Sequence, residues 1–215
     1  MEKRYDLISI DLDGTITSVI TEEFVLKKLA PDRLEEYLRL DKELIENYDR
    51  FEELTKKQFE LLIGLEVDVV KEVIRSAPLT KNIVEAVKEM KEDGFKVIIL
   101  TDNIDVFCEA IMETIPFDNA ISSQTIRRNN KIVGLGKLNL RKEEGLKEFV
   151  KKEKIDLSRC IHIGDWRNDI PVFNIVGLSI AFCPKDPEVI RHAALTFNID
   201  DFLILYKIIR EITYH

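Results

Sequence analysis

The stretch LISIDLDGT, residues 7–15, decides the fold class. Residues 7–10 are suited to a buried strand, and two carboxylates, Asp11 and Asp13, follow it one residue apart, just before Gly14. In an open α/β sheet, ligands bind in the crevice outside the carboxyl ends of the strands. Because strand side chains alternate between faces, both carboxylates reach one crevice only where a glycine lets the chain bend. The stretch predicts a cation site, or a nucleophile with an acid/base partner, and an Asp-Gly hairpin turn is the alternative.

Strand and helix patterns alternate along the rest of the chain. The first strand is expected over residues 3–10, and apolar residues recur with a helical period over residues 17–77. Further on, the patterns predict helices over 81–93, 146–154 and 201–211, strands over 96–100, 160–163 and 178–182, and a hairpin with strands 123–126 and 132–133. This alternation favours an α/β fold with a doubly wound parallel sheet. We therefore expect a core domain of residues 1–16 and 78–215, and a helical cap domain of residues 17–77.

Composition and charge exclude several classes of protein. The 215 residues are 45% hydrophobic, which is enough for a buried core. A net charge of −8 without a basic stripe disfavours nucleic acid as a partner. No apolar run approaches the roughly 18 residues of a membrane helix, and residues 1–5 lack the apolar stretch of a signal peptide. Three widely spaced cysteines fit reduced thiols, so we expect a cytoplasmic protein without membrane partners, whose oligomeric state is left open.

A hydroxyl group follows the predicted strand over residues 96–100. Thr101 comes directly after this strand, and Asp102 and Asn103 lead into the next helix. A hydroxyl beside the backbone N–H groups at a helix start forms a phosphate-binding position. Capping of that helix by Thr101 or Asp102 is the alternative.

A second acidic cluster, GDWRND, spans residues 164–169 and follows the predicted strand 160–163. Magnesium (Mg²⁺) binds oxygen ligands in octahedral geometry and keeps water and substrate phosphate among them. Asp11 and Asp165, with one backbone carbonyl, would suffice as its protein ligands. The alternative is a helix cap with Asp169 facing solvent.

Lys142 opens the helix that precedes this cluster. A lysine there would neutralise phosphate oxygens and hold an aspartate nucleophile near the group that is transferred. Lysine at a helix start usually faces solvent, since basic side chains are disfavoured there. Lys137 is the other candidate for this role.

These segments together resemble the haloacid dehalogenase superfamily of phosphatases over essentially the whole chain. Four parts of the chain are similar to its four motifs, in order: residues 11–15, Thr101, Lys142 and residues 164–169. Within the superfamily, the stretch GLSIAFC (177–183) and the helical insertion resemble the phosphoserine phosphatase branch. The resemblance implies a Rossmann-like parallel sheet with a small helical cap inserted after the first strand.

The resemblance also implies a two-step hydrolysis of a small phosphorylated metabolite. Asp11 would attack phosphorus to form an aspartyl-phosphate, and Asp13 would protonate the leaving alkoxide and then activate water. Magnesium is the implied cofactor, and the implied metal site consists of Asp11, Asp165, the Asp13 carbonyl and Asp169, which orders the ligands. The implied phosphate-binding residues are Leu12, Asp13, Thr101, Asp102, Asn103, Lys142 and Asn168.

The residues that read the substrate headgroup depart from the phosphoserine phosphatase pattern. That branch uses a glutamate after the first motif and an arginine from the cap, and these positions fall on Ile20 and Gln58. Isoleucine cannot pair with an ammonium group, and glutamine offers a carboxylate no charged donor. If the alignment is shifted, the substitutes are Glu22 or Glu23, and Arg50, Lys56 or Lys57.

Two other functions fit the same fold. A phosphotransferase or mutase would pass the aspartyl-phosphate to a second alcohol. A catalytically silent module would bind a phosphorylated ligand without cleaving it, and the loss of Asp11 or Asp13 would mark such a module. Because both residues are present, the sequence favours the enzyme.

Overall fold

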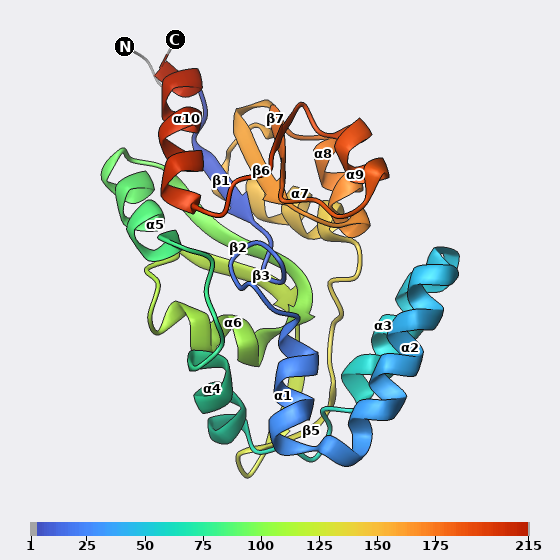
Figure 1. Cartoon of the computed structure of the whole chain (residues 1–215). Coiled ribbons are helices and arrows are strands. Elements are labelled where there is room, and N and C mark those ends of the chain that lie inside the picture. The colour runs from blue at the N-terminus through green and yellow to red at the C-terminus, as the bar shows by residue number, and fades with distance from the viewer. Residues whose placement is uncertain (1–3, 215) are drawn as a thin grey trace.

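The computed structural model describes residues 4–214 and contains a six-stranded sheet in the order β3-β2-β1-β6-β7-β8 (Figure 1). Its strands are β1 (Leu7–Ile10), β2 (Lys96–Ile104), β3 (Asn119–Ser123), β6 (Cys160–Gly164), β7 (Leu178–Phe182) and β8 (Leu195–Phe197). Every neighbouring pair is parallel. From β1 the chain adds β2 and β3 on one side of it, and then adds β6, β7 and β8 on the other side. The strand order therefore reverses at β1, and in such sheets ligands bind at this switch point. The predicted doubly wound α/β fold is confirmed.

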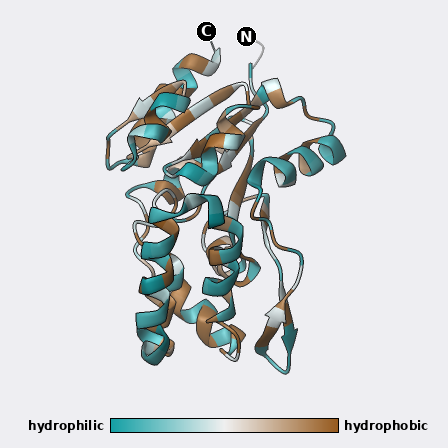
Figure 2. Ribbon diagram, turned by 90° about the vertical axis from the view of Figure 1, so that its right-hand side faces the viewer, coloured by the Kyte–Doolittle hydropathy of each residue, from teal (hydrophilic) through white to brown (hydrophobic). Residues whose placement is uncertain are grey.

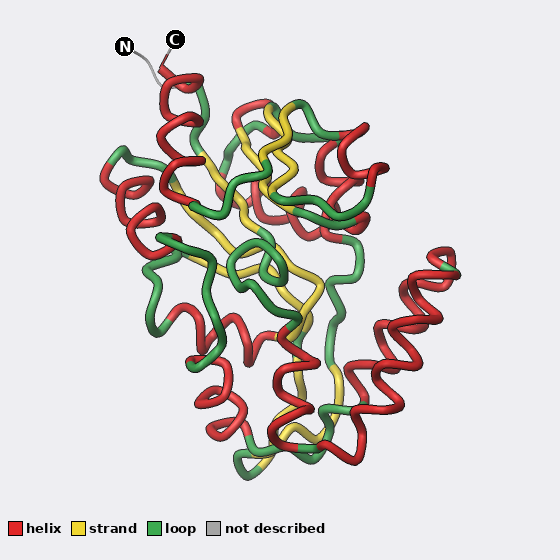
Figure 3. The backbone as a smooth tube through the Cα atoms, viewed as in Figure 1, coloured by secondary structure: helices red, strands yellow, loops and turns green. Residues whose placement is uncertain are grey.

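The sheet is buried on both faces, which explains the apolar strand sequences. The side chains of Ile8 and Ile10 pack toward α5 (Ile83–Glu92), α6 (Asp105–Met112) and α10 (Phe202–Tyr214). Leu7 lies on the opposite face, with α7 (Lys142–Glu153) and α8 (Ile170–Phe173). The short helix α9 (Pro187–His192) contacts α8. Figure 3 shows the strands between these two groups of helices.

The cap consists of four helices and a hairpin that lie below the sheet in Figure 1. Its elements are α1 (Thr21–Leu29), α2 (Leu34–Glu46), α3 (Phe51–Glu60), α4 (Val67–Arg75), β4 (Thr125–Arg128) and β5 (Lys131–Leu135). The helices have one hydrophobic and one hydrophilic side (Figure 2), and α2 buries Tyr37 and Leu40. The hairpin is joined to this group because the N–H of Gly64 donates to the Ile132 carbonyl at 2.7 Å. The hairpin falls within residues 78–215, the range predicted as core. The boundaries of the cap at residues 17 and 77 stay a prediction.

Several element boundaries differ from the prediction. The expected start of the first strand at Lys3 lies outside the described residues, and β1 begins at Leu7. Strand β2 runs to Ile104, so Thr101 lies within it; the pairing of β2 with β3 shifts register between Leu100 and Ile104. Helix α7 begins at Lys142, as expected for that residue, and so extends four residues further toward the N-terminus than the predicted range 146–154. No strand had been predicted at β3 or β8.

The hairpin forms two residues later than predicted on its first strand. Its turn contains Asn129 and Asn130, with φ values of 49° and 60°. Asparagine tolerates this left-handed backbone and is favoured in two-residue hairpin turns. Within residues 4–214, no helix has the length and apolar character needed to cross a bilayer.

Candidate active site

The carboxyl ends of β1 and β6 meet in the middle of the sheet. Ile10 pairs with Ile163, and the N–H of Asp11 donates to the Ile163 carbonyl at 2.9 Å. The chain turns after Asp13 at Gly14, whose φ is +79°. This turn leads into the cap and does not close a hairpin, since β1 and β2 are parallel.

Gly14 also brings the first motif against the fourth. A Cβ atom at residue 14 would lie 2.2 Å from Asp165 Oδ2, a distance at which atoms overlap. The Thr15 hydroxyl donates to Asp165 Oδ1 at 3.4 Å from the same turn. Gly14 therefore leaves room for the Asp165 carboxylate beside the turn that follows Asp11, a residue that is only 3% exposed.

Lys142 lies at the centre of this group. Its Nζ atom is 2.7 Å from Asp11 Oδ1 and 2.7 Å from Asp169 Oδ1, and the side chain is fully buried. Burial lowers the pKa of Lys142, but the adjacent Asp11 and Asp169 outweigh it and raise this pKa above its usual range. Lysine at this helix start thus faces the site and not the solvent. Lys137, the other candidate, pairs with Glu148 on the surface.

Asp169 is the acceptor that fixes the lysine. In addition to Lys142, the His162 Nε2 atom lies 3.1 Å from Asp169 Oδ1, and the N–H groups of Asp165 and Trp166 donate to Oδ2 at 3.0 and 3.1 Å. Burial alone would raise the pKa of Asp169, but Lys142 and His162 hold it well below its usual range. The alternative in which Asp169 faces solvent is wrong, because the residue is completely buried.

His162 also belongs to this site, although it was not among the residues predicted from the sequence. Its Nδ1 atom lies 2.9 Å from the Ser9 hydroxyl, and the two residues are paired between β6 and β1. The available signal was a pair of polar residues at matching places in two apolar strands. A buried polar side chain in such a strand needs a partner, and here each supplies one to the other.

Three buried carboxylates converge at this point. Asp11, Asp165 and Asp169 each place one oxygen within 4.8 Å of the others. Burial raises the pKa of Asp11 well above its usual range, and burial together with Asp169 raises the pKa of Asp165 to about 7. A divalent cation would offset this excess of negative charge. Because Asp169 already accepts from four donors, Asp11 and Asp165 are better placed to be direct ligands.

Asp13 lies on the cap side of the same crevice. Its Oδ1 accepts the N–H of Thr21 at 3.0 Å, and its Oδ2 accepts the amide of Asn103 at 2.9 Å. Burial raises the pKa of Asp13, although hydrogen bonds from Thr21 and Glu22 oppose the rise. Burial and the Asp13 charge raise the pKa of Glu22 well above its usual range. Glu22 and Asp13 thus lie close together, and both pKa values are raised, which suits a site that exchanges a proton.

Most of the other predicted phosphate-binding residues support the site from the protein interior and do not line the crevice. The Asn103 amide also donates to Thr21, and its oxygen accepts the N–H of Ile104. Thr101 is buried and its hydroxyl accepts the N–H of Asn103 at 3.1 Å, while no side chain caps α6. Leu12 packs in the core, so a phosphate would meet only its backbone. Asn168 donates to the Asp102 carboxylate.

A family model for haloacid dehalogenase-like hydrolases matches residues 5–177. The chain belongs to this hydrolase family. It is 31% identical over 189 residues to the phosphoserine phosphatase of Methanocaldococcus jannaschii, covering 86% of this chain and 89% of that one. It is 28% identical over 199 residues to the phosphoserine phosphatase of Archaeoglobus fulgidus, covering 90% of this chain and 56% of that one.

Solved structures agree with this assignment. A substrate-bound phosphoserine phosphatase complex is similar to the chain with a TM-score of 0.81 and 28% identity, over 96% of this chain and 99% of that one. A family hydrolase from Salmonella enterica, at 20% identity and a TM-score of 0.85 over 93% of this chain and 69% of that one, shows the shared fold alone. The predicted membership, fold and phosphomonoester hydrolysis are confirmed.

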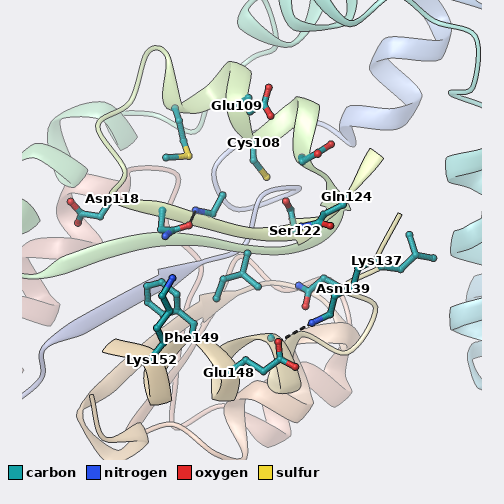
Figure 4. A pocket seen from close by; sticks show the side chains of 17 residues that line it. Cys108, Glu109, Asp118, Ser122, Gln124, Lys137, Asn139, Glu148, Phe149 and Lys152 are labelled. Atoms are coloured by element: carbon teal, nitrogen blue, oxygen red, sulfur yellow. Dashed lines mark hydrogen bonds and ion pairs between the residues drawn. The ribbon is translucent and has the colours of Figure 1, made fainter. Parts of the chain in front are cut away.

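The crevice of this hydrolase opens into a cavity of about 210 Å³ between core and cap. Core residues on its wall are Asp11, Asp13, Asp102, Asp165, Trp166, Asn168 and Lys185. The cap contributes nine residues. Three are aliphatic, namely Ile20, Leu44 and Ile45, and the other six, called here the cap wall, are Glu22, Tyr37, Asp41, Phe51, Thr55 and Gln58. A larger groove of about 700 Å³ runs along β3 between α6 and α7, where Lys137 reaches Glu148 (Figure 4), and contains none of the carboxylates around Lys142.

The two headgroup positions lie at this cavity. Ile20 is 44% exposed and lines its mouth. Gln58 is 5% exposed, and its amide donates to the Asp41 carboxylate. Among the substitutes, Glu22 reaches the cavity, but Arg50 pairs with Glu43 and Glu53 at the cap surface. Glu23, Lys56 and Lys57 also lie outside it.

Proposed function

We propose that this hydrolase cleaves a small phosphomonoester in a magnesium-dependent reaction, with Asp11 as nucleophile. The observation that carries the proposal is the position of Lys142 between Asp11 and Asp169, fully buried at the carboxyl end of β1. The lysine cation opposes the effect of burial on the pKa of Asp11 and holds its carboxylate in place, and it lies where it can also attract phosphate oxygens.

Magnesium would be held by Asp11 and Asp165, with the Asp13 carbonyl as a further ligand, and when bound it offsets the charge between nucleophile and phosphate. Asp169 would not bind the metal directly, because its oxygens already accept from Lys142, His162 and two backbone N–H groups. It orders the ligands and the lysine instead.

Asp13 would supply the proton. In the first step an Asp11 oxygen bonds to phosphorus, the bond to the ester oxygen breaks, and Asp13 gives its proton to the departing alkoxide. In the second step Asp13 takes a proton from the water that attacks phosphorus, and the Asp11 carboxylate leaves. The raised pKa of Asp13, caused by its burial, supports its protonated state at the first step.

Asn103 and Thr21 would position Asp13 in both steps, since each donates to its carboxylate. The substrate would be a small phosphorylated metabolite, because the cavity of about 210 Å³ is below the roughly 300 Å³ at which drug-sized pockets begin. The free cysteines Cys108, Cys160 and Cys183 support a reducing compartment such as the cytoplasm.

The test is phosphate release from a panel of phosphomonoesters, with magnesium and then with excess chelator. We expect turnover that the chelator abolishes and that Asp11→Asn reduces below a few per cent. A phosphate adduct on the peptide that contains Asp11, detected by mass spectrometry after acid quenching, identifies the nucleophile. Binding without turnover across the panel would indicate the silent module. Transfer of phosphate to an added alcohol in preference to water would indicate the phosphotransferase.

A further inference from the structure

Beyond the residues around Lys142, the cavity is lined by carboxylates, aromatic rings and the aliphatic side chains of Ile20, Leu44 and Ile45. Glu22 and Asp41 come from the cap wall, and Asp102 comes from the core. Tyr37, Phe51 and Trp166 contribute aromatic side chains to the same cavity. Carboxylates and aromatic faces both attract cations.

Gln58 and Asp41 explain why this lining of the cavity is acidic. Gln58 occupies the position matched to an arginine in the related branch, so the cavity lacks that positive charge. The neutral Gln58 amide donates to Asp41, and the Asp41 carboxylate itself lines the cavity. Burial and the nearby Glu23 raise the pKa of Asp41, against the effect of the Gln58 amide. A cation in the cavity would remove much of the cost of burying this charge.

Two basic residues near the cavity are already engaged in ion pairs. Lys142 binds Asp11 and Asp169, and Arg167 pairs with Asp186. Among the described residues, Lys185 is the one cation on the cavity wall. It lies at the mouth beside Ile20 and Asp165, on the side of the predicted metal site. Within the part of the chain that the structure describes, Glu22 and Asp41 form no ion pair with Lys185, and no basic group is among the main causes of their pKa shifts.

Thr55 gives a second, independent indication of a ligand. Its side chain is only 4% exposed and lines the cavity, and its hydroxyl has no hydrogen-bond partner among residues 4–214. Buried hydroxyl groups are almost always satisfied, so this atom lacks a partner that a bound molecule would supply. The hydroxyl oxygen accepts from a donor such as an ammonium group.

We propose that the alcohol released by this enzyme carries an ammonium group and no carboxylate, so that its substrates are phosphate esters of short amino alcohols. This inference rests on the proposed function. The ammonium group would donate to Asp41, Glu22 and Thr55, with the aromatic rings around it. A headgroup carboxylate, as in phosphoserine, would meet these same acids and be repelled.

The test compares kcat/KM for four esters of similar size at saturating magnesium. O-phosphoethanolamine carries only the amine, n-propyl phosphate neither group, O-phosphoserine both groups, and phosphoglycolate only the carboxylate. We expect phosphoethanolamine to exceed each of the others by about tenfold or more, the ratio that a charge-assisted hydrogen bond provides. Equal rates for phosphoethanolamine and n-propyl phosphate, or a preference for phosphoserine, would overturn the inference.

The same assay separates this failure from a failure of the proposed function. Hydrolysis of p-nitrophenyl phosphate without any advantage for the amine refutes only the substrate class. Magnesium-independent or absent hydrolysis of every ester, the generic one included, refutes the proposed function itself.

Two cap-wall variants assign the effect to residues. Asp41→Asn keeps the shape of the side chain, and we expect the ratio of phosphoethanolamine to n-propyl phosphate to fall toward one, mainly through KM. Thr55→Val should lower the same ratio by a smaller factor. Asp32→Asn removes an exposed acid elsewhere on the cap and is the matched control, for which the ratio stays as in the parent. An unchanged ratio in Asp41→Asn, with normal thermal unfolding, contradicts the assignment.

Discussion

Lys142 and Asp169 form an ion pair with no solvent exposure on either side chain, and the Nζ and Oδ1 atoms are 2.7 Å apart. The same ammonium group contacts Asp11 at an equal distance. Asp169 thus influences Asp11 indirectly, because it fixes the position of the Lys142 ammonium group. His162 and Ser9 extend this arrangement across the sheet from β6 to β1.

Replacing Asp169 by asparagine should impair both stability and activity. Asp169→Asn keeps the shape but removes the charge that balances Lys142, and breaking a buried pair costs about 3–5 kcal/mol of unfolding free energy. We expect kcat to fall by about 10- to 100-fold, as for other residues that orient a site through its ligands. Urea unfolding and steady-state kinetics measure the two effects.

The matched control is Glu148→Gln, which breaks the surface pair with Lys137, where both side chains are largely exposed. Exposed pairs contribute little, so this variant should match the parent in both assays. Equal behaviour of the two variants would contradict the structural role of Asp169.

Stability without metal should fall as the pH rises toward neutrality. The pKa of Asp165 is raised from 3.8 to about 7, with burial as the main cause, so the folded protein binds more protons than the unfolded chain between these values. Stability therefore decreases with rising pH across that window. Asp11, Asp13 and Glu22 shift in the same direction.

Thermal unfolding in chelator at a series of pH values tests this prediction. Adding magnesium near pH 7.5 should raise Tm, because the ion binds the deprotonated carboxylates. The same addition near pH 5 should have a much smaller effect. In Asp165→Asn the dependence of Tm on pH should weaken; a Tm that rises from pH 5 to 7 in the metal-free parent would refute the argument.

A methyl group at residue 14 should displace Asp165. In Gly14→Ala the new Cβ atom would overlap the Asp165 carboxylate, at a backbone φ that alanine rarely adopts. Displacement of a reacting group by about 1 Å costs on the order of a hundredfold in rate, and we expect a loss of this size in kcat/KM. Gly134→Ala, where the added atom meets only ordinary contacts, is the control and should keep its activity.

Charged residues at the two headgroup positions should change which phosphate ester the enzyme prefers. Gln58→Arg combined with Ile20→Glu restores the residues that bind a carboxylate and an ammonium group in the related branch. We expect the ratio of phosphoserine to phosphoethanolamine turnover to rise at least tenfold, since the introduced guanidinium group donates to the headgroup carboxylate.

Gln124→Arg adds the same guanidinium group at an exposed position outside the cavity and is the control for the added arginine. An identical ratio in the double variant, the control and the parent would place recognition of the headgroup elsewhere in the chain.

The central carboxylates of the site could be predicted from local sequence, because the strands that carry them are each followed directly by acidic residues. Apolar strands such as β1 and β6 are followed by acids, and parallel strands bring those ends to one edge. Thr101 was misplaced relative to its strand, because β2 continues through a register shift that no local pattern marks.

The positions of the cap-wall residues could not be predicted from the local sequence. Asp41 and Thr55 lie on amphipathic helices where a polar residue is expected to face water, and only the packing of α2 and α3 over the core turns them toward the cavity. The bond between Gln58 and Asp41 is likewise a contact between two helices, and no spacing along the chain indicates it.

The hairpin β4–β5 has a consequence for how the substrate enters. The hairpin is hydrogen-bonded to the cap near Gly64, so it belongs with the cap, and four backbone segments connect the cap and the core. These segments form two pairs, and the members of each pair are hydrogen-bonded or bridged to each other. One pair joins Thr17 to Leu79, and in the other the N–H of Gln124 donates to the Lys137 carbonyl at 2.8 Å. Ion pairs of Lys71 with Glu109 and of Arg75 with Glu113 join α4 of the cap to α6 of the core and the residue that follows it as well. Any opening of the cap that admits the substrate must therefore keep both pairs of connecting segments and break or stretch these surface ion pairs, which cost little to separate.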